Sequence, residues 1–356
     1  MGIDISKNFY RKEIQGLKAI GVLGIIFSNL NLTLFRSGYL GIDIFFVISG
    51  FVLTSSLISY INSQDFWKFT SELYTKRIKR FVPVISFYVI ILSVLVCLFI
   101  PQKELIIRTG ISSLFGISNL YLLKQSTDFF AQSNILNPFS HTWSLAIIEQ
   151  FYLFFPIIFW ISKVIGKKTF KRNLFYTILF LFTISFSSFI FLSYTNISKA
   201  FFLMPTRFWE ISAGSLAFLI YEKIHVMKIT EKIPTSILFL FIIGLLSLPI
   251  QITSLSIILM VLILVLFLLS IKKNTLIYKL LTTKFILFIG SISNSLFVWH
   301  FGVLSISKWL GLNNSIEIIF FQIFIIFIIS ITSFNLLERK FKNSKETKEK
   351  VFLFGI

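Results

Sequence analysis

Long apolar stretches separated by short polar segments recur along the whole chain. A helix that crosses a bilayer needs about 20 mostly apolar residues. The stretches that approach this length are residues 17–35, 40–60, 81–100, 141–162, 174–194, 206–221, 234–249, 252–271, 285–305 and 315–337. The pattern therefore predicts an all-α fold, a polytopic membrane helix bundle of about ten transmembrane helices.

One further stretch, residues 105–124, is interrupted by polar and glycine residues such as Arg108 and Gly110. If it does not cross, most of the 34 Lys and Arg residues fall in gaps on one side of the membrane. Because cytoplasmic loops carry an excess of Lys and Arg, we expect both termini in the cytoplasm. Residues 101–140 then form an external, partly re-entrant segment with a turn at Asn137-Pro138.

The composition supports a bilayer as the main solvent. Hydrophobic residues make up 56% of the chain and charged residues 14%, with a mean hydropathy of +0.86. Soluble domains are near one-quarter charged. The formal net charge is +19. The basic residues are concentrated in the short loops, which is typical of a membrane protein's topology and does not indicate nucleic-acid binding. We expect one membrane domain over residues 1–342 and a short basic cytoplasmic tail over residues 343–356. The single cysteine, Cys97, excludes an intrachain disulfide and is expected to serve packing.

A few ionisable side chains interrupt the apolar stretches. Placing one at the centre of a bilayer costs about 2.5–3.5 kcal/mol, so each needs a structural or functional reason. These residues are Asp43, His141, Glu149, Arg207, Glu210 and His300. Most fall near the expected external ends of their spans, which suggests a polar cavity that opens outward.

The spacing of these residues leaves structural and functional interpretations open. Arg207 and Glu210 are three positions apart and can pair along one helix face. His141 begins a span beside Trp143, with Glu149 two turns further along, and this arrangement favours a site. Asp43 is compatible with packing and with a site, and for His300 beside Trp299 a packing role is the simpler interpretation while a site stays open.

The segment from Phe66 to Arg80 alternates aromatic residues with basic ones. The simpler interpretation is a cytoplasmic amphipathic segment lying on anionic lipid. The alternative is that Arg77 and Arg80 bind an anionic ligand such as coenzyme A. Nothing in the sequence resembles a metal site, a phosphate-binding glycine loop or a nucleic-acid-binding module.

Several strings occur in the order typical of one family. They are Tyr10-Arg-Lys-Glu-Ile-Gln-Gly-Leu-Lys, Gly38-Tyr-Leu-Gly-Ile-Asp-Ile-Phe-Phe-Val-Ile-Ser-Gly-Phe51, Leu136-Asn-Pro-Phe-Ser-His-Thr-Trp-Ser-Leu-Ala-Ile-Ile-Glu-Gln-Phe-Tyr152, Thr206-Arg-Phe-Trp-Glu and Gly290-Ser-Ile-Ser-Asn-Ser-Leu-Phe-Val-Trp-His300, with Glu338 closing the series. The chain thus resembles the integral-membrane acyltransferase family 3. The resemblance implies a ten-span protein of the bacterial cytoplasmic (inner) membrane. It would transfer an acyl group, usually acetyl, from acyl-CoA to a hydroxyl of a lipid-linked or surface polysaccharide or lipopolysaccharide.

The resemblance is incomplete in the first span. The family pattern places an arginine and a histidine eleven positions apart there, and the alignment puts Lys18 and Asn29 at these positions. Both would face one side of a helix, about 16 Å apart. An amide cannot take a proton from a sugar hydroxyl near neutral pH, although Asn29 could donate to a developing oxyanion.

Three outcomes therefore stay open. The base could be His141 assisted by Glu149, or it could be His300. A partner acyltransferase or a second copy of this chain could supply the missing group. Alternatively, the protein could be a non-enzymatic relative that binds glycolipid or acyl-CoA. A transporter is a more distant alternative, because no paired broken helices in two similar halves are visible.

Residue roles follow from the resemblance as expectations. We assign Lys18, Arg77 and Arg80 to acyl-CoA, which acts as a co-substrate rather than as a bound cofactor. A substrate-binding or structural role is expected for Asp43, Trp143, Arg207 and Glu210. The expected partners are membrane lipid and a glycan acceptor, without nucleic acid or metal.

Overall fold

The structure, a computed structural model, describes residues 11–58, 66–101, 103–126, 137–166, 169–226, 233–249, 254–312 and 315–343. These residues form helices and short turns without any strand, which confirms the all-α prediction. The α-helices are α1 (Lys12–Asn29), α2 (Gly41–Ile58), α3 (Phe66–Phe99), α4 (Glu104–Leu114), α5 (Ser118–Ser126), α6 (Trp143–Ile165), α7 (Phe170–Thr195), α8 (Ile197–Phe202), α9 (Met204–Val226), α10 (Thr235–Ser247), α11 (Ser254–Ser270), α12 (Leu276–Leu281), α13 (Lys284–Ser291), α14 (Ser293–Trp309), α15 (Ile316–Ser333) and α16 (Lys340–Asn343). Short turns of other helix types are η2 (Thr33–Phe35), η3 (Gly38–Leu40), η5 (Ser140–Thr142) and the π-helical η7 (Phe334–Arg339). Apart from Asn343, the predicted basic tail lies outside the described residues.

Several helices are long and apolar enough to cross a membrane. Within the described ranges five qualify, namely Gly38–Ile58, Thr70–Phe99, Ser140–Ile165, Phe170–Thr195 and Ile316–Arg339. A sixth is added if α13 and α14, which meet at a 66° bend, count as one span. Helices α10 and α11 are apolar but shorter. The chain is therefore a multi-pass membrane protein, while the count of ten and the cytoplasmic location of the termini stay predictions.

The outer surface of the bundle is apolar. On α3 the exposed side chains include Phe87, Ile90, Val94 and Leu98, which recur at helical spacing along one face. A soluble protein rarely exposes so continuous an apolar surface, whereas lipid chains match it. Cys97 is exposed on the same helix, so the expectation that it serves internal packing is wrong.

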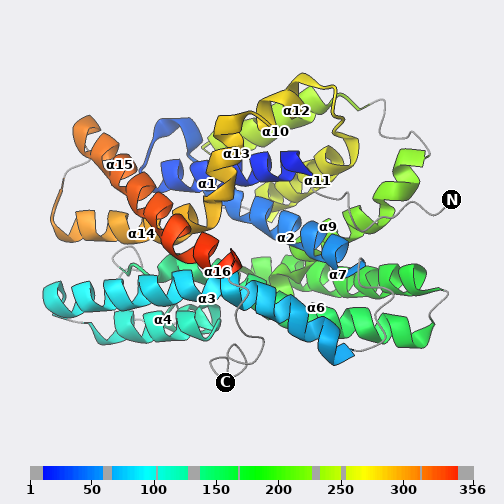
Figure 1. Ribbon diagram of the computed structural model, residues 1–356, viewed down its shortest axis with the longest axis horizontal. Helices are drawn as coiled ribbons and strands as arrows, with labels where there is room; N and C mark the ends of the chain where they lie inside the picture. The colour runs from blue at the N-terminus through cyan, green and yellow to red at the C-terminus, as the bar shows by residue number, and fades with distance from the viewer. Residues whose placement is uncertain are drawn as a thin grey trace.

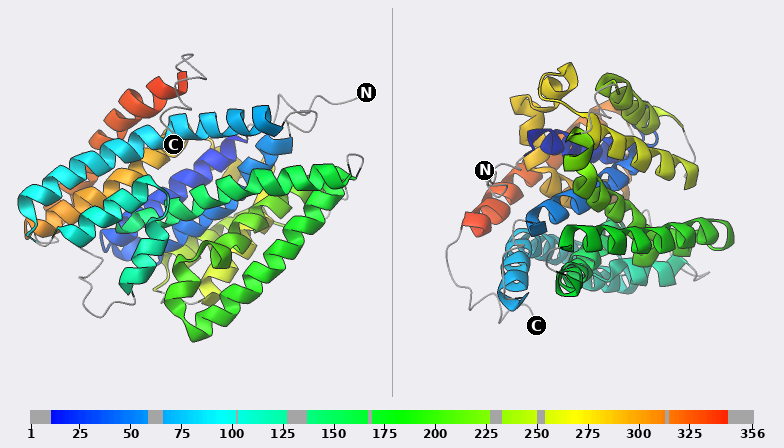
Figure 2. Two further views of the ribbon diagram at one scale, coloured as in Figure 1. Left: turned by 90° about the horizontal axis from the view of Figure 1, so that it is seen from below. Right: turned by 90° about the vertical axis from the view of Figure 1, so that its right-hand side faces the viewer.

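The bundle surrounds α1, which contacts α2, α13 and α14 (Figure 1). Helices α2 and α9 pack closely, and two glycines allow this approach. A Cβ atom on Gly50 would overlap the Ile211 carbonyl, and one on Gly214 would overlap the Val47 carbonyl. Small residues at a helix contact let the two backbones approach, as is common in membrane bundles. Figure 2 shows the long helices lying side by side along one direction.

Helices α4 and α5 form a bent-back pair rather than a span. Helix α4 packs against α3, and the chain turns at Gly116, whose φ of +66° suits a residue without a side chain. Gln150 of α6 donates to the Gly116 carbonyl at 2.9 Å, and Gln125 at the end of α5 donates to Thr109 of α4 at 3.4 Å. The end of α5 therefore lies beside α4, while the prediction of an external, partly re-entrant segment stays a prediction.

Helix α3 differs from the sequence prediction. The segment 66–80 was expected to lie on the membrane surface, followed by a separate span at residues 81–100. Instead one helix of 34 residues runs without a break through Pro83, and its residues Arg77 and Arg80 face a cavity inside the bundle. Packing against other helices overrides the amphipathic pattern here.

The contact between α2 and α9 predicts a difference between two glycines. Gly214→Ala should cost about 1–3 kcal/mol, because the added methyl group forces the helices apart. Gly244→Ala is the matched control, since nothing lies within 4 Å of its added Cβ and alanine favours a helix. Melting temperatures of the purified proteins in detergent check this. Equal temperatures for the two variants would contradict it.

Candidate functional site

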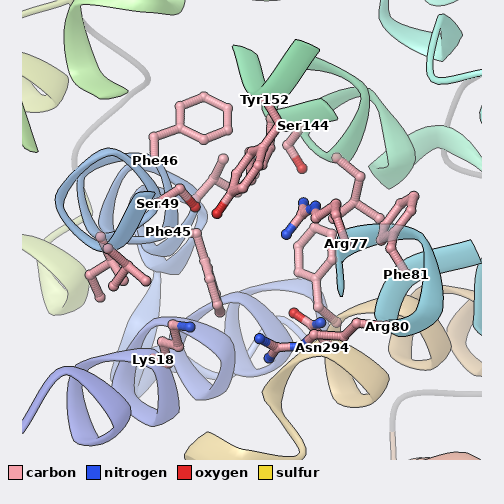
Figure 3. Close-up of a pocket in the computed structure, with 16 residues that line it drawn as sticks. Lys18, Phe45, Phe46, Ser49, Arg77, Arg80, Phe81, Ser144, Tyr152 and Asn294 are labelled. Atoms are coloured by element: carbon pink, nitrogen blue, oxygen red, sulfur yellow. The ribbon is translucent and has the colours of Figure 1, made fainter. Parts of the chain in front are cut away.

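A cavity opens between helices α1, α2, α3, α6 and α14 (Figure 3). It contains about 720 Å³ of space not filled by atoms, part of it open to the surroundings. Lys18 faces it from α1, and Arg77 and Arg80 face it from α3. The rest of the lining is mostly apolar and aromatic, and it includes Phe45, Phe46, Leu145, Ile148, Tyr152 and Phe297. The fold thus brings together the three cations that were expected to bind acyl-CoA.

Arg77 is held in the cavity wall by a carboxylate and by aromatic rings. Its Nε and Nη2 atoms donate to the same Oε1 atom of Glu149, at 2.9 and 2.5 Å. The guanidinium carbon lies 4.2 Å from the centre of the Tyr152 ring and 5.5 Å from that of Phe81. Glu149 therefore orients Arg77, and the interpretation that it assists His141 is wrong.

Arg80 lies beside a second buried carboxylate, Glu338. The Glu338 Oε1 atom accepts a hydrogen bond from the Ser295 hydroxyl at 2.6 Å, and its Oε2 atom lies 3.8 Å from Arg80 Nε. The cavity region therefore holds three cations against two carboxylates, Glu149 and Glu338. This excess of positive charge favours an anionic ligand.

The imidazole of His300 is fully buried and fixed at both nitrogens. Its Nδ1 lies 2.6 Å from the Phe297 carbonyl oxygen. A carbonyl only accepts hydrogen bonds, so Nδ1 carries the proton and Nε2 carries the lone pair. The Asn29 amide nitrogen lies 3.3 Å from Nε2 and donates to it. His300 is thereby held as the tautomer whose Nε2 can accept a proton.

His141 lies next to His300 in an aromatic enclosure. Its ring centre is 5.4 Å from that of His300, 5.4 Å from that of Phe297 and 5.3 Å from that of Phe301. Neither ring nitrogen of His141 has a hydrogen-bond partner of good geometry within the described part of the chain. Over the same residues, no group of His, Cys, Asp and Glu side chains is placed to hold a metal ion.

A third group consists of buried charges that pair with one another. Arg207 Nη1 lies 2.6 Å from Glu210 Oε1, which confirms the predicted pair, and Arg207 Nη2 lies 3.4 Å from Asp43 Oδ1. The guanidinium carbon is 5.3 Å from the ring centre of Phe201 and 5.7 Å from that of Trp143. Trp143 therefore covers this ion cluster and not the imidazoles.

The arrangement differs from the predicted outward cavity. Asp43, His141, Arg207, Glu210 and His300 do not line the cavity, which is formed around the three cations instead. The histidines contact one residue of its lining, Phe297. Two lining residues, Ser144 and Phe297, are each three residues from a histidine, which is one helical turn.

Sequence reasoning assigned no role to several residues of this region, although all of them occur in the family strings. Phe297, Tyr152 and Asn294 line the cavity, and Ser295 and Glu338 support it. Phe297, Asn294 and Ser295 occur in the string that ends at His300, so that string was the available signal. Their separate roles were not visible, because an aromatic residue in an apolar helix looks like ordinary packing.

Comparison with known proteins identifies relatives. The family model described as Acyltransferase domain matches residues 11–337. The O-acetyltransferase OatA of Staphylococcus aureus (strain NCTC 8325 / PS 47) is 32% identical over 322 residues, which cover 83% of this chain and 51% of OatA. OatA of strain MRSA252 matches with the same values. The chain spans about half the length of these curated relatives, and no solved structure matches it.

The buried ion cluster predicts a strong dependence on its cation. Arg207→Met leaves two carboxylates buried without a partner and should cost about 3–5 kcal/mol. The triple variant Asp43→Asn, Arg207→Met, Glu210→Gln should recover much of this loss, because it also removes the unpaired charges. The measurement is the melting temperature and the yield of monodisperse protein in detergent.

The matched control is Arg108→Met. Arg108 pairs with Glu104, but their side chains are 60% and 76% exposed, so the change should cost less than about 1 kcal/mol. A similar loss for Arg108→Met and Arg207→Met would show that burial does not decide the effect.

Proposed function

This chain belongs to the acyltransferase domain family, and on that premise we propose that it transfers an acetyl group from acetyl-CoA to a hydroxyl of a cell-envelope glycan. Family membership makes it an acyltransferase, and its relatives are named O-acetyltransferases. The donor and the acceptor are our proposal. The observation that carries it is the cationic cavity whose apolar wall adjoins a histidine of defined tautomer.

The donor would bind with its phosphates at Lys18, Arg77 and Arg80. Coenzyme A carries several phosphate groups, and guanidinium groups pair with phosphate through two parallel hydrogen bonds. Because Glu149 holds Arg77 in place, little side-chain freedom is lost when the ligand binds. The apolar part of the cavity would then take the rest of the donor, with the thioester directed toward Phe297.

The acceptor hydroxyl would lose its proton to His300. As the hydroxyl oxygen attacks the thioester carbon, the C–O bond forms, the C–S bond breaks and His300 Nε2 takes the hydroxyl proton. The imidazolium then returns this proton to the coenzyme A thiolate, which leaves as the thiol. The acceptor hydroxyl would replace the Asn29 amide at His300 Nε2. The Asn29 N–H would then donate to the oxyanion that forms on the thioester carbonyl oxygen. His141 is the second candidate for the base.

The membrane arrangement in this proposal has ten spans and both termini in the cytoplasm of a bacterial inner membrane. Lys18 would then lie toward the cytoplasmic end of α1, and Asn29 at its outer end. Acyl-CoA is cytoplasmic and the envelope glycan is external, so the two substrates would approach from opposite sides. The eleven residues between Lys18 and Asn29 span about 16 Å, roughly half the apolar thickness of a bilayer.

The reaction can be tested with purified protein, acetyl-CoA and a lipid-linked glycan. We expect an acetyl ester on the glycan by mass spectrometry, together with one free thiol per ester. His300→Ala should lower the rate by about 10²- to 10⁴-fold while acetyl-CoA still binds. Asn29→Ala should have a smaller effect, because the base is retained.

Wild-type turnover by His300→Ala would remove the assignment of the base. If the wild-type protein binds acetyl-CoA but forms no ester, while an active relative does so under the same conditions, the non-enzymatic alternative replaces the proposal.

The donor site predicts a separate effect on binding. Arg80→Ala should raise the KM for acetyl-CoA about tenfold or more, because a charge-assisted hydrogen bond contributes about 1.5–3 kcal/mol. Arg80→Lys should recover part of the loss. Arg108→Ala removes an exposed arginine that does not line the cavity, so its KM should equal the wild-type value. Equal KM values for the two alanine variants would contradict the donor site.

A further inference from the structure

One residue of the cavity lining contacts both histidines. Phe297 lines the cavity, whereas His141 and His300 do not. The centre of the Phe297 ring is 5.4 Å from that of His141 and 5.5 Å from that of His300. The ring therefore borders the cavity and contacts both imidazoles.

Phe297 is held firmly in this position. It is 5% exposed, and its ring centre lies 6.1 Å from that of Phe45, another lining residue. Its backbone carbonyl separately accepts the hydrogen bond from His300 Nδ1. A substitution at Phe297 therefore changes the wall of the cavity while the backbone contact that fixes the His300 tautomer is retained.

The wall also limits the space in front of the histidines. A donor that binds with its phosphates at the cations would direct its acyl group toward the histidines. Phe297, Phe45 and Leu145 are apolar lining residues of the cavity, and the Phe297 ring contacts both imidazoles. An acetyl group adds one methyl group beyond the thioester carbon, whereas a butyryl group adds two more methylenes, which need room that the phenyl ring occupies.

We propose that the side chain of Phe297 sets the acyl size that this protein accepts, by bounding the donor cavity where it adjoins the imidazoles. This inference rests on the proposed function. It assigns Phe297 to donor specificity alone. The acceptor hydroxyl must still reach both the thioester carbon and His300 Nε2, so the ring limits the acyl group without closing off the imidazole. The bonds formed and broken are those of the acyl transfer described above.

The test is the ratio of kcat/KM for butyryl-CoA to kcat/KM for acetyl-CoA. Phe297→Ala removes the phenyl ring and should raise this ratio about tenfold or more, since two buried methylenes gain roughly 0.8 kcal/mol each. Phe297→Leu should give an intermediate ratio. A ratio is measured within one preparation, so partial loss of folded protein does not change it.

Phe301→Ala is the matched control. Its ring contacts the same two histidines, with centres 5.3 Å from His141 and 5.9 Å from His300, but it does not line the cavity. The acyl ratio of Phe301→Ala should stay at the wild-type value. An unchanged ratio in Phe297→Ala, or an equal increase in Phe301→Ala, would overturn the inference.

Two further results separate this inference from the proposed function. If the wild-type protein transfers acetyl groups and Phe297→Ala leaves the acyl ratio unchanged, the inference about Phe297 is rejected and the proposed function is retained. If the wild-type protein does not turn over, the proposed function fails, and the ratio of dissociation constants for butyryl-CoA and acetyl-CoA then tests the wall directly. If Phe297→Ala does not fold, Phe297→Leu decides by the same ratios, and an unchanged value in that variant rejects the proposal.

Discussion

The burial of charge among apolar helices is the constraint on which this arrangement depends. A charge without a partner in such surroundings costs several kcal/mol. Arg207 on α9 therefore lies between Glu210 of the same helix and Asp43 of α2. Arg77 on α3 is held by Glu149 of α6. The Asp43–Arg207 pair connects α2 with α9, and the Arg77–Glu149 pair connects α3 with α6. These pairs tie together helices that are distant in sequence, and the second one also holds a residue of the cavity lining in place.

The cavity differs from the buried ion cluster because its cations exceed its carboxylates. Lys18, Arg77 and Arg80 face space rather than a full set of counterions, and anionic ligands are attracted to such a site. The neighbouring histidine has the complementary property, a nitrogen whose lone pair is assigned by a backbone carbonyl. An acyl transfer needs both properties, one to hold the donor and the other to accept a proton.

Two sequence interpretations were wrong for the same reason. The basic and aromatic residues of segment 66–80 predicted a surface segment, and the spacing of His141 and Glu149 predicted a working pair. Both interpretations considered only which residues lie on the same face of one helix, and neither considered the neighbouring helix. The structure instead places Arg77 opposite Glu149, because a charged residue on one helix binds whichever opposite charge the neighbouring helix presents.

The sequence alone determined the all-helical class, the membrane as solvent and the ionisable residues that interrupt the apolar stretches. These follow from hydropathy and composition, which are local properties of each segment. Only the tertiary structure decided which side chains meet. Asn29 and His300 are 271 positions apart, and Phe297 becomes a wall only when α14 packs beside the cavity. Such contacts depend on the packing of whole helices, and no spacing within one segment encodes it.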